Sequence, residues 1–222
     1  MYQKAMTYPD FHTHSIPSVG MYNWMVDEWL ADPKPPSALV SVGIHPWYVA
    51  AHELNVHLQR LEEIAALPQV RCIGECGLDR LQGPALPLQT EAFRAQALLA
   101  EEVQKPVVIH CVRAHQELLA LHAALKPDVP WILHGFVQKH QTALPFIQHD
   151  FYFSFGAALR NPQSSASRVL PLIPMNRVLL ETDTADCSIQ QIYEAAAERL
   201  SLPVEVLVEK IFTTFAAICG KF

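Results

Sequence analysis

Six residues of the kinds that bind divalent metal ions lie in or directly after short apolar runs of the chain. His12 and His14 occupy alternate positions of Asp10-Phe11-His12-Thr13-His14, so on a strand they share one face. The other four each follow a later apolar run and are Glu75, His110, His134 and Asp183. Mixed imidazole and carboxylate groups suit Zn²⁺, Mn²⁺, Fe²⁺, Ni²⁺ or Co²⁺, and Mg²⁺ also stays open. The set therefore predicts a metal site able to activate water for hydrolysis.

The number of candidate ligands bears on how many ions the site takes. Six ligands exceed the need of a single four-coordinate ion, so we expect one or two divalent ions, with Glu75 as the candidate bridge. Two cations roughly 3.5–4 Å apart could share a hydroxide and polarise a phosphoryl or carbonyl oxygen. Asp183 could bind metal and also accept the proton of the attacking water as general base. Glu75 and Asp183 are therefore the predicted catalytic residues.

The elements that must position these ligands alternate along the chain. Short runs rich in β-branched or aromatic residues indicate strands that are buried on both faces. Beyond the strand at residues 10–14, these runs cover residues 39–44, 70–74, 106–109, 130–133, 151–155 and 177–180. Apolar residues at helical spacing predict helices at residues 54–64, 90–103, 118–125, 189–200 and 204–218. Residues 15–38 show no clear pattern, with residues 21–29 readable as a strand or a helical turn.

Repeated β-α-β units require parallel strands joined by right-handed crossovers, which leaves a doubly wound sheet or a closed barrel. In a (β/α) barrel of the TIM type all carboxyl ends of the strands meet at one mouth, where active sites form. Four ligand-type residues at equivalent strand ends favour this barrel. With no linker or repeat in the sequence, we expect residues 1–222 to form a single domain.

Several further polar residues near these strand ends could assist. His45 follows a strand and could contact a phosphate or leaving group, or be structural, and Arg113 could hold an anion or be solvated. Asp79 could support a ligand or form a turn, and Asp10 could accept a ring N–H from a histidine ligand. The remaining histidines fall on helical or loop patterns and are predicted to lie on the surface: His52, His57, His115, His122, His140 and His149.

Composition limits the classes of function. The formal net charge of -6 opposes indiscriminate binding to phosphate backbones, although bound metal ions would add positive charge at the site. Five cysteines without a Cys-x-x-Cys pair predict free thiols in a reducing compartment. Neither a signal peptide nor a membrane-spanning run is recognisable, so we expect a cytoplasmic protein. Nothing in the sequence indicates a membrane or protein partner.

In this order, the motifs resemble those of the TatD family of metal-dependent hydrolases within the amidohydrolase-like barrels. The matching strings are Asp10-x-His12-x-His14, Gly43-Ile44-His45-Pro46, Gly74-Glu75-x-Gly77-Leu78-Asp79, Gln89 and Gln96 around Phe93, residues 106–110 with Arg113, His134-Gly135-Phe136, residues 153–156 and Leu180-Glu181-Thr182-Asp183. The resemblance implies a divalent-metal phosphodiesterase, a candidate deoxyribonuclease acting on DNA. It also implies the same six metal ligands and a substrate contact at His45.

The chain departs from the family pattern in three places. The stretch between His14 and His45 is short for a full β-α unit, which predicts a barrel shortened or distorted near its second strand. The family's Cys-Phe-Ser-Gly string is replaced by Gly135-Phe136-Val137-Gln138, and the basic Arg-Asn-Glu-Pro string after Asp183 is absent. These departures are compatible with a substrate other than DNA. The alternatives are hydrolysis of a small amide, ester or phosphomonoester, and a metal-binding protein without turnover.

Overall fold

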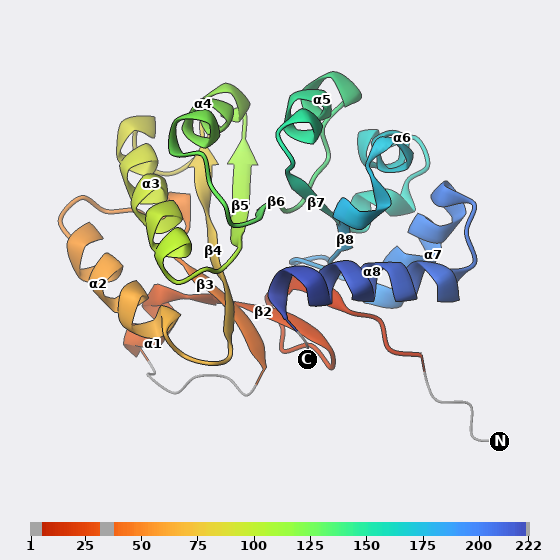
Figure 1. Cartoon of the computed structure of the whole chain (residues 1–222), viewed down its shortest axis with the longest axis horizontal. Helices are drawn as coiled ribbons and strands as arrows, with labels where there is room; N and C mark the ends of the chain where they lie inside the picture. Colours follow the sequence, from red (N-terminus) through yellow and green to blue (C-terminus); the bar gives the residue numbers. More distant parts are fainter. Residues whose placement is uncertain (1–5, 32–37, 221–222) are drawn as a thin grey trace.

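Eight parallel strands form one sheet whose spatial order follows the order along the chain (Figure 1). The structure is a computed structural model, and it describes residues 6–31 and 38–220. The strands are β1 (Asp10–Thr13), β2 (Gly20–Met25), β3 (Leu39–Gly43), β4 (Val70–Asp79), β5 (Val107–Val112), β6 (Trp131–Leu133), β7 (Tyr152–Phe155) and β8 (Val178–Leu180). Parallel pairing of consecutive strands requires each connection to carry the chain from the carboxyl end of one strand back to the amino end of the next.

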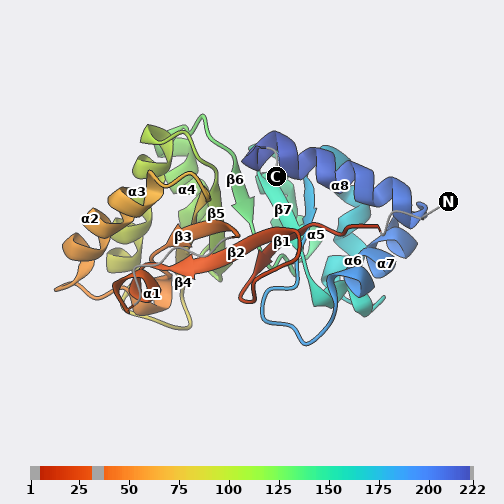
Figure 2. The same cartoon turned by 90° about the horizontal axis from the view of Figure 1, so that it is seen from below.

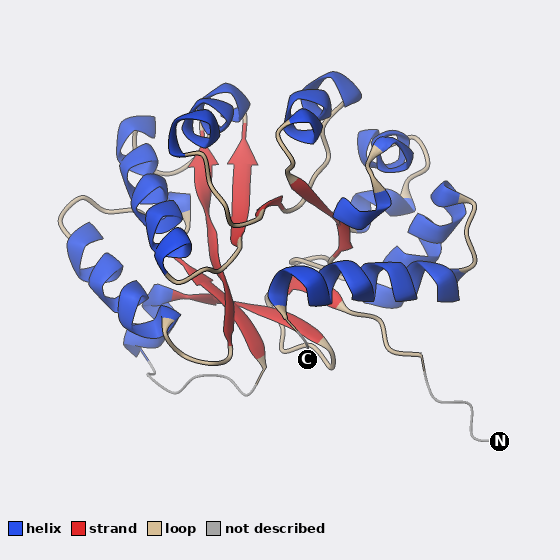
Figure 3. Cartoon of the chain, viewed as in Figure 1, coloured by secondary structure: helices blue, strands red, loops and turns tan. Residues whose placement is uncertain are grey.

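Most of these connections contain a helix, as the sequence predicts. The α-helices are α1 (Val26–Ala31), α2 (Leu54–Ala65), α3 (Leu86–Glu102), α4 (His115–Leu125), α5 (His140–Gln148), α6 (Ser165–Val169), α7 (Ile189–Leu200) and α8 (Val204–Cys219). Four short 3-10 turns accompany them: η1 (Pro46–Tyr48), η2 (Ala157–Arg160), η3 (Leu170–Leu172) and η4 (Met175–Arg177). The helices lie outside the strands, with α1–α3 on one side and α6–α8 on the other (Figures 2 and 3).

The sheet curls until its first and last strands meet. Thr13 forms an isolated parallel bridge with Asp183, just beyond β8. The amide of Asp183 donates to the carbonyl oxygen of His12 at 2.8 Å, and the amide of His14 donates to Asp183 O at 3.4 Å. The predicted TIM-type barrel is therefore confirmed, and closure occurs at two segments that carry candidate ligands.

The second strand departs from the regular pattern, as the sequence predicts. Only residues 14–19 separate β1 from β2, and this return contains no helix. β2 nevertheless pairs in register with β3, from Met21 opposite Leu39 to Met25 opposite Gly43. Both readings of residues 21–29 are partly correct, because β2 passes directly into α1. The proline-rich stretch at residues 32–36 lies outside the described residues.

Two layers of apolar packing hold the barrel. The larger lies between the strands and the surrounding helices. The smaller, here called the base cluster, fills the barrel interior toward the amino ends of the strands. It comprises Phe11, Met21, Cys72, Val108, Ile132, Leu179, Phe215 and Cys219. The last two come from α8, so this helix covers the amino end of the barrel. None of the helices in the described ranges has the length and apolar character that a membrane span requires.

Candidate metal centre and active site

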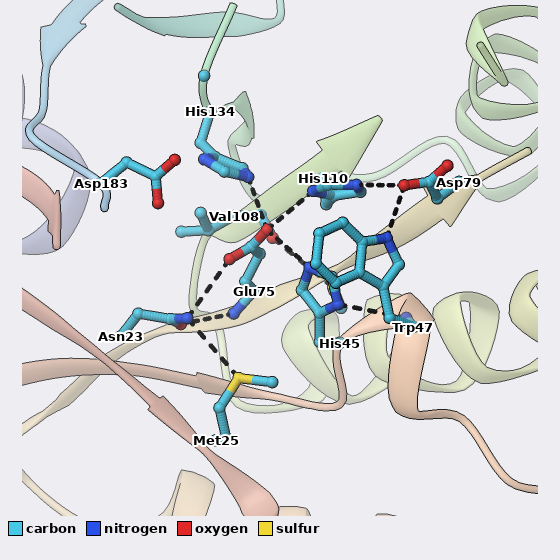
Figure 4. Close-up of polar contacts among 12 residues, drawn as sticks. Asn23, Met25, His45, Trp47, Glu75, Asp79, Val108, His110, His134 and Asp183 are labelled. Atoms are coloured by element: carbon cyan, nitrogen blue, oxygen red, sulfur yellow. Dashed lines mark hydrogen bonds and ion pairs between the residues drawn. The ribbon is translucent and has the colours of Figure 1, made fainter. Parts of the chain in front are cut away.

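Glu75 is the centre of a polar cluster at the carboxyl ends of the strands (Figure 4). It lies in the middle of β4, which continues to Asp79, and only 3% of its surface is exposed. Gly77 follows at a backbone φ of +151°, where a Cβ atom would overlap the carbonyl oxygen of His110. Glycine therefore allows β4 to approach β5 closely beside the cluster.

The two carboxylate oxygens of Glu75 face two different sets of imidazoles. Oε1 lies 3.0 Å from Nε2 of His45, 3.0 Å from Nδ1 of His110 and 2.7 Å from Nε2 of His134. Oε2 lies 3.3 Å from Nε2 of His12 and 3.9 Å from Nε2 of His14. One carboxylate thus lies between two sets of imidazoles, one from β1 and the residue after it, and the other from β5 and the residues that follow β3 and β6.

Asp183 completes the cluster from the end of β8. Its Oδ1 lies 3.4 Å from Nε2 of His14 and 3.9 Å from Nε2 of His12. Its backbone is left-handed, with φ +52°, and its side chain is 35% exposed. The six predicted ligands are therefore brought together, and we call them the rim cluster: His12, His14, Glu75, His110, His134 and Asp183.

The donor set fits divalent cations. His12 is fully buried, and neither of its ring nitrogens has a hydrogen-bond partner within the described part of the chain. A buried imidazole in this state is costly unless something else satisfies it. Among the residues that the structure describes, three groups offer ligand atoms within 4.8 Å of one another: His12 with His134 and Asp183, His12 with His14 and Glu75, and His45 with Glu75 and His110. The geometry thus adds His45 to the possible metal ligands.

The charges in the cluster depend on one another. Burial alone would raise the pKa of Glu75, but the imidazoles of His134, His110 and His12 hold it well below its usual range. Burial likewise opposes the charge of Asp183, yet the hydrogen bond from His14 lowers the pKa of that carboxyl. Both carboxylates are therefore ionised at neutral pH, as metal ligands must be.

Neighbouring side chains fix the orientation of the imidazoles. Asp79 Oδ2 lies 3.0 Å from Nε2 of His110 and accepts a 2.6 Å hydrogen bond from Nε1 of Trp47. Its Oδ1 also accepts from the amides of Leu81 and Gln82, so both predicted roles of Asp79, ligand support and turn formation, are present. Such partners set the tautomer and direction of a ligating imidazole.

Glu181 supports a second imidazole from below. It is fully buried, and its Oε1 accepts a 2.6 Å hydrogen bond from the amide of Gly135 and lies 3.5 Å from Nδ1 of His134. Asn23, on β2, is a functional residue that the sequence reasoning missed. Its Oδ1 accepts from the amide of Glu75 at 2.9 Å, and its Nδ2 donates to Glu75 Oε2 at 3.4 Å. The sequence reasoning missed Asn23 because a single amide side chain within a strand does not change the hydrophobic pattern.

Two expectations from the sequence, those for Asp10 and His57, differ from the structure. Asp10 does not support an imidazole: its two oxygens accept from the amide and hydroxyl of Thr182, at 2.9 and 2.6 Å. Arg113 is exposed and lies outside the lining of the pocket over the cluster, which agrees with its solvated alternative, while the anion contact stays a prediction. His57 is buried rather than on the surface, with Nε2 3.3 Å from Oδ1 of Asp27. The apolar stripe Leu54, His57, Leu61 could have shown this burial.

A pocket of about 370 Å³ opens over the rim cluster. Aromatic and sulfur side chains share its lining with the polar groups, and its described lining contains no lysine or arginine. The lining consists of His14, Met25, His45, Trp47, Tyr48, Glu75, His110, His134, Asp183 and Thr184. A ligand here would meet apolar walls and a polar floor, which is the usual composition of a small-molecule site.

Comparisons with known proteins agree with this site. The sequence profile described as TatD related DNase matches residues 11–218. The 3'-5' ssDNA/RNA exonuclease TatD of Citrobacter rodentium is 35% identical over 164 residues, 67% of this chain and 57% of the relative. The enzyme of the same name from Enterobacter lignolyticus is 34% identical over 154 residues, 64% of this chain and 56% of the relative. The matches thus span little more than half the length of these curated relatives.

Among solved structures, YJJV, a TatD homologue from Escherichia coli K12, superposes with a TM-score of 0.83 at 19% identity. That match covers 97% of this chain and 98% of the other. A TatD family hydrolase from Entamoeba histolytica gives a TM-score of 0.76 at 14% identity, over 98% and 99% of the two chains. At these identities the likeness establishes the fold, and the profile match over nearly the whole chain establishes the family. The chain belongs to the TatD related DNase family.

Proposed function

We propose that this chain is a divalent-metal-dependent phosphodiesterase that cleaves single-stranded DNA or RNA from the 3′ end. The curated relatives named as 3'-5' ssDNA/RNA exonucleases support the substrate class. The observation that carries the proposal is the position of Glu75, whose two oxygens face two separate sets of imidazoles. That arrangement suits a carboxylate bridging two cations.

The donor set would divide between two ions. His12, His14 and Asp183 would hold one beside Oε2 of Glu75, and His110 and His134 would hold the other beside Oε1. The donor set is compatible with several divalent ions: Zn²⁺, Mn²⁺, Mg²⁺, Ni²⁺, Fe²⁺ and Co²⁺. When bound, such ions lower the pKa of water and polarise a phosphoryl oxygen.

The remaining chemistry falls to the protein's own groups. Asp183 would accept the proton of the attacking water, since its carboxylate is ionised and partly exposed to the pocket. His45 lies beside Glu75 at the floor of the pocket and would contact a phosphate oxygen or the leaving group. Asp79 would hold the ring of His110 in place through its 3.0 Å contact. Arg113 keeps only a peripheral role, at most with more distant phosphates.

A second candidate, hydrolysis of a small phosphoester, is favoured by the charge of the pocket. The described lining contains no lysine or arginine, so it offers few side-chain cations for a long polyanion. A small amide or ester would use the same water and the same base.

Activity on defined substrates tests the proposal. Protein loaded with Mn²⁺ or Zn²⁺ is offered single-stranded DNA and RNA labelled at the 5′ end, and also bis(p-nitrophenyl) phosphate. Stepwise shortening from the 3′ end, abolished by Asp183→Asn and retained by Asp186→Asn, is the expected result. Asp186 is an exposed aspartate three residues further on and serves as the matched control. Turnover of the small diester alone would favour the second candidate, and full metal occupancy without any turnover would favour a binding protein.

We also propose that the chain forms one domain and works in a reducing compartment. A single continuous eight-stranded sheet supports one domain over residues 1–222. All five cysteines are free thiols, which supports a reducing compartment such as the cytoplasm.

A further inference from the structure

Tyr48 is an aromatic side chain held at the mouth of the catalytic pocket. It lines the same pocket as Glu75 and Asp183, yet 56% of its surface is exposed. Buried aromatics are explained by packing, whereas a half-exposed ring at a pocket wall offers a free π-face. Such faces are what proteins use to stack nucleobases without sequence preference.

The turn that carries Tyr48 is anchored by hydrogen bonds and close packing of its neighbours. Tyr48 ends the 3-10 turn η1, which His45 caps by accepting a 3.2 Å hydrogen bond from the amide of Trp47 at Nδ1. Trp47 is fixed in turn through Nε1 to Asp79. Gly83, at φ +81°, packs so closely on Pro46 and Trp47 that a Cβ would meet Pro46 O at 2.6 Å. The backbone that carries Tyr48 is therefore already in place, and only the side chain of Tyr48 would lose freedom when a base binds.

Tyr48 lies close to the proposed site of the chemistry. The ring centroids of Tyr48 and His45 are 5.6 Å apart, and Nε2 of His45 is 3.0 Å from Oε1 of Glu75. One imidazole therefore separates the tyrosine ring from the centre of the rim cluster. One sugar likewise separates a base from its own phosphate, so a phosphate over the rim cluster brings the attached base to Tyr48.

Resting on the proposed nuclease function, we propose that Tyr48 is a stacking platform for the nucleobase that adjoins the scissile phosphate, and that it selects single-stranded substrates. A base in a duplex has its faces covered by neighbouring pairs, whereas a base at a single-stranded end can leave its stack. Because the described pocket lining contains no lysine or arginine, stacking supplies much of the binding that cations supply elsewhere. Cleavage should then depend only weakly on salt.

The test compares oligothymidylate with the same strand made abasic at its last two 3′ positions, each cleaved by metal-loaded protein. Tyr48→Ala should lower kcat/KM about 10-fold to 100-fold on the intact strand, mostly through KM, and leave cleavage of the abasic strand unchanged. Tyr48→Phe, which keeps the ring, should behave like the wild type. Phe212→Ala, which removes a 41% exposed aromatic from α8, is the matched control.

A binding measurement supplies a second readout. In the Asp183→Asn background, 2-aminopurine at the 3′ end should be quenched on binding, and adding Tyr48→Ala should remove the quenching. Equal losses on intact and abasic strands, or no loss at all, would overturn the platform and leave the nuclease function standing. Wild-type protein that cleaves no oligonucleotide would overturn the proposed function itself, and the platform with it.

Discussion

The two ends of the barrel interior are built by the same strands and differ in nearly every physical respect. At the base, Val108 and Ile132 are fully buried and apolar. Two residues later on the same strands come His110 and His134 of the rim cluster. The strand alternation of two residues thus places an apolar layer directly beneath a polar one.

The two ends differ in whether their buried side chains find partners within the protein. The base cluster is closed by Phe215 and Cys219 of α8. The rim cluster keeps a fully buried imidazole, His12, with neither ring nitrogen hydrogen-bonded within the described residues. We infer that the base supplies stability and the rim supplies the site, so that changes at one end should leave the other end's property intact.

The largest expected effect is at the rim. Asp183→Asn removes the proposed proton acceptor, which is also a proposed metal ligand, while keeping the shape of the side chain. Turnover should fall by about 10²-fold to 10⁴-fold, because general base catalysis contributes on that scale. Steady-state kinetics on single-stranded DNA measures this, and the melting temperature of the metal-free protein should change little. A large loss of stability in that state would break the division between the two ends.

Truncating a side chain of the base cluster should lower stability and leave metal binding unchanged. Phe215 packs against Phe11 with ring centroids 5.7 Å apart, and both are fully buried. Phe215→Ala should lower the free energy of unfolding by about 3–5 kcal/mol, as expected for a buried phenylalanine. Denaturant unfolding measures the loss. Per folded molecule the metal content should remain that of the wild type, and a protein that folds but binds no metal would contradict the separation.

Metal binding should itself stabilise the protein through the rim. An ion that binds the native state alone, at 100 times its dissociation constant, adds about 2.7 kcal/mol to the free energy of unfolding. Thermal melts with Mn²⁺ or Zn²⁺ and with a chelator should therefore differ in the wild type. In His12→Ala the shift should shrink, while the exposed control His140→Ala should retain it. An unchanged shift in His12→Ala would place the stabilising ion elsewhere.

A smaller effect is expected one step away from the ligands. Asp79→Asn replaces the acceptor that orients His110 and keeps its volume. Metal affinity should fall by about 10-fold to 100-fold, the range for partners of ligating histidines. Titration calorimetry measures the affinity. Wild-type affinity in Asp79→Asn would mean that the strand alone fixes the ring of His110.

The parts of this molecule that could be predicted from its sequence are those governed by strong local patterns. Apolar runs such as residues 106–109 predicted the strands, and the ligand-type residues after four of these runs predicted the rim cluster, because parallel strand ends must converge. The helices with clear apolar stripes, α2, α7 and α8, were predicted within a few residues.

What could not be predicted lacks such a pattern. β2 was uncertain because no helix precedes it, so the β-α-β rhythm is interrupted. α5 carries Pro145 in its interior and α6 has five residues, too few for a helical period. The role of Asn23 rests on its hydrogen bond with Glu75, which lies 52 positions away in the sequence. Asp10 is hydrogen-bonded to Thr182, 172 positions away, rather than to an imidazole. Both contacts form only when the strands assemble into the barrel, so local sequence does not specify them.

The central claim, that Glu75 joins two metal sites, is tested most directly by counting bound ions. Elemental analysis of protein reconstituted with excess Zn²⁺ or Mn²⁺ should give two ions per chain for the wild type and for the exposed control Glu63→Gln. Glu75→Gln should retain at most one. Two ions per chain in Glu75→Gln, or none in the wild type, would contradict the account.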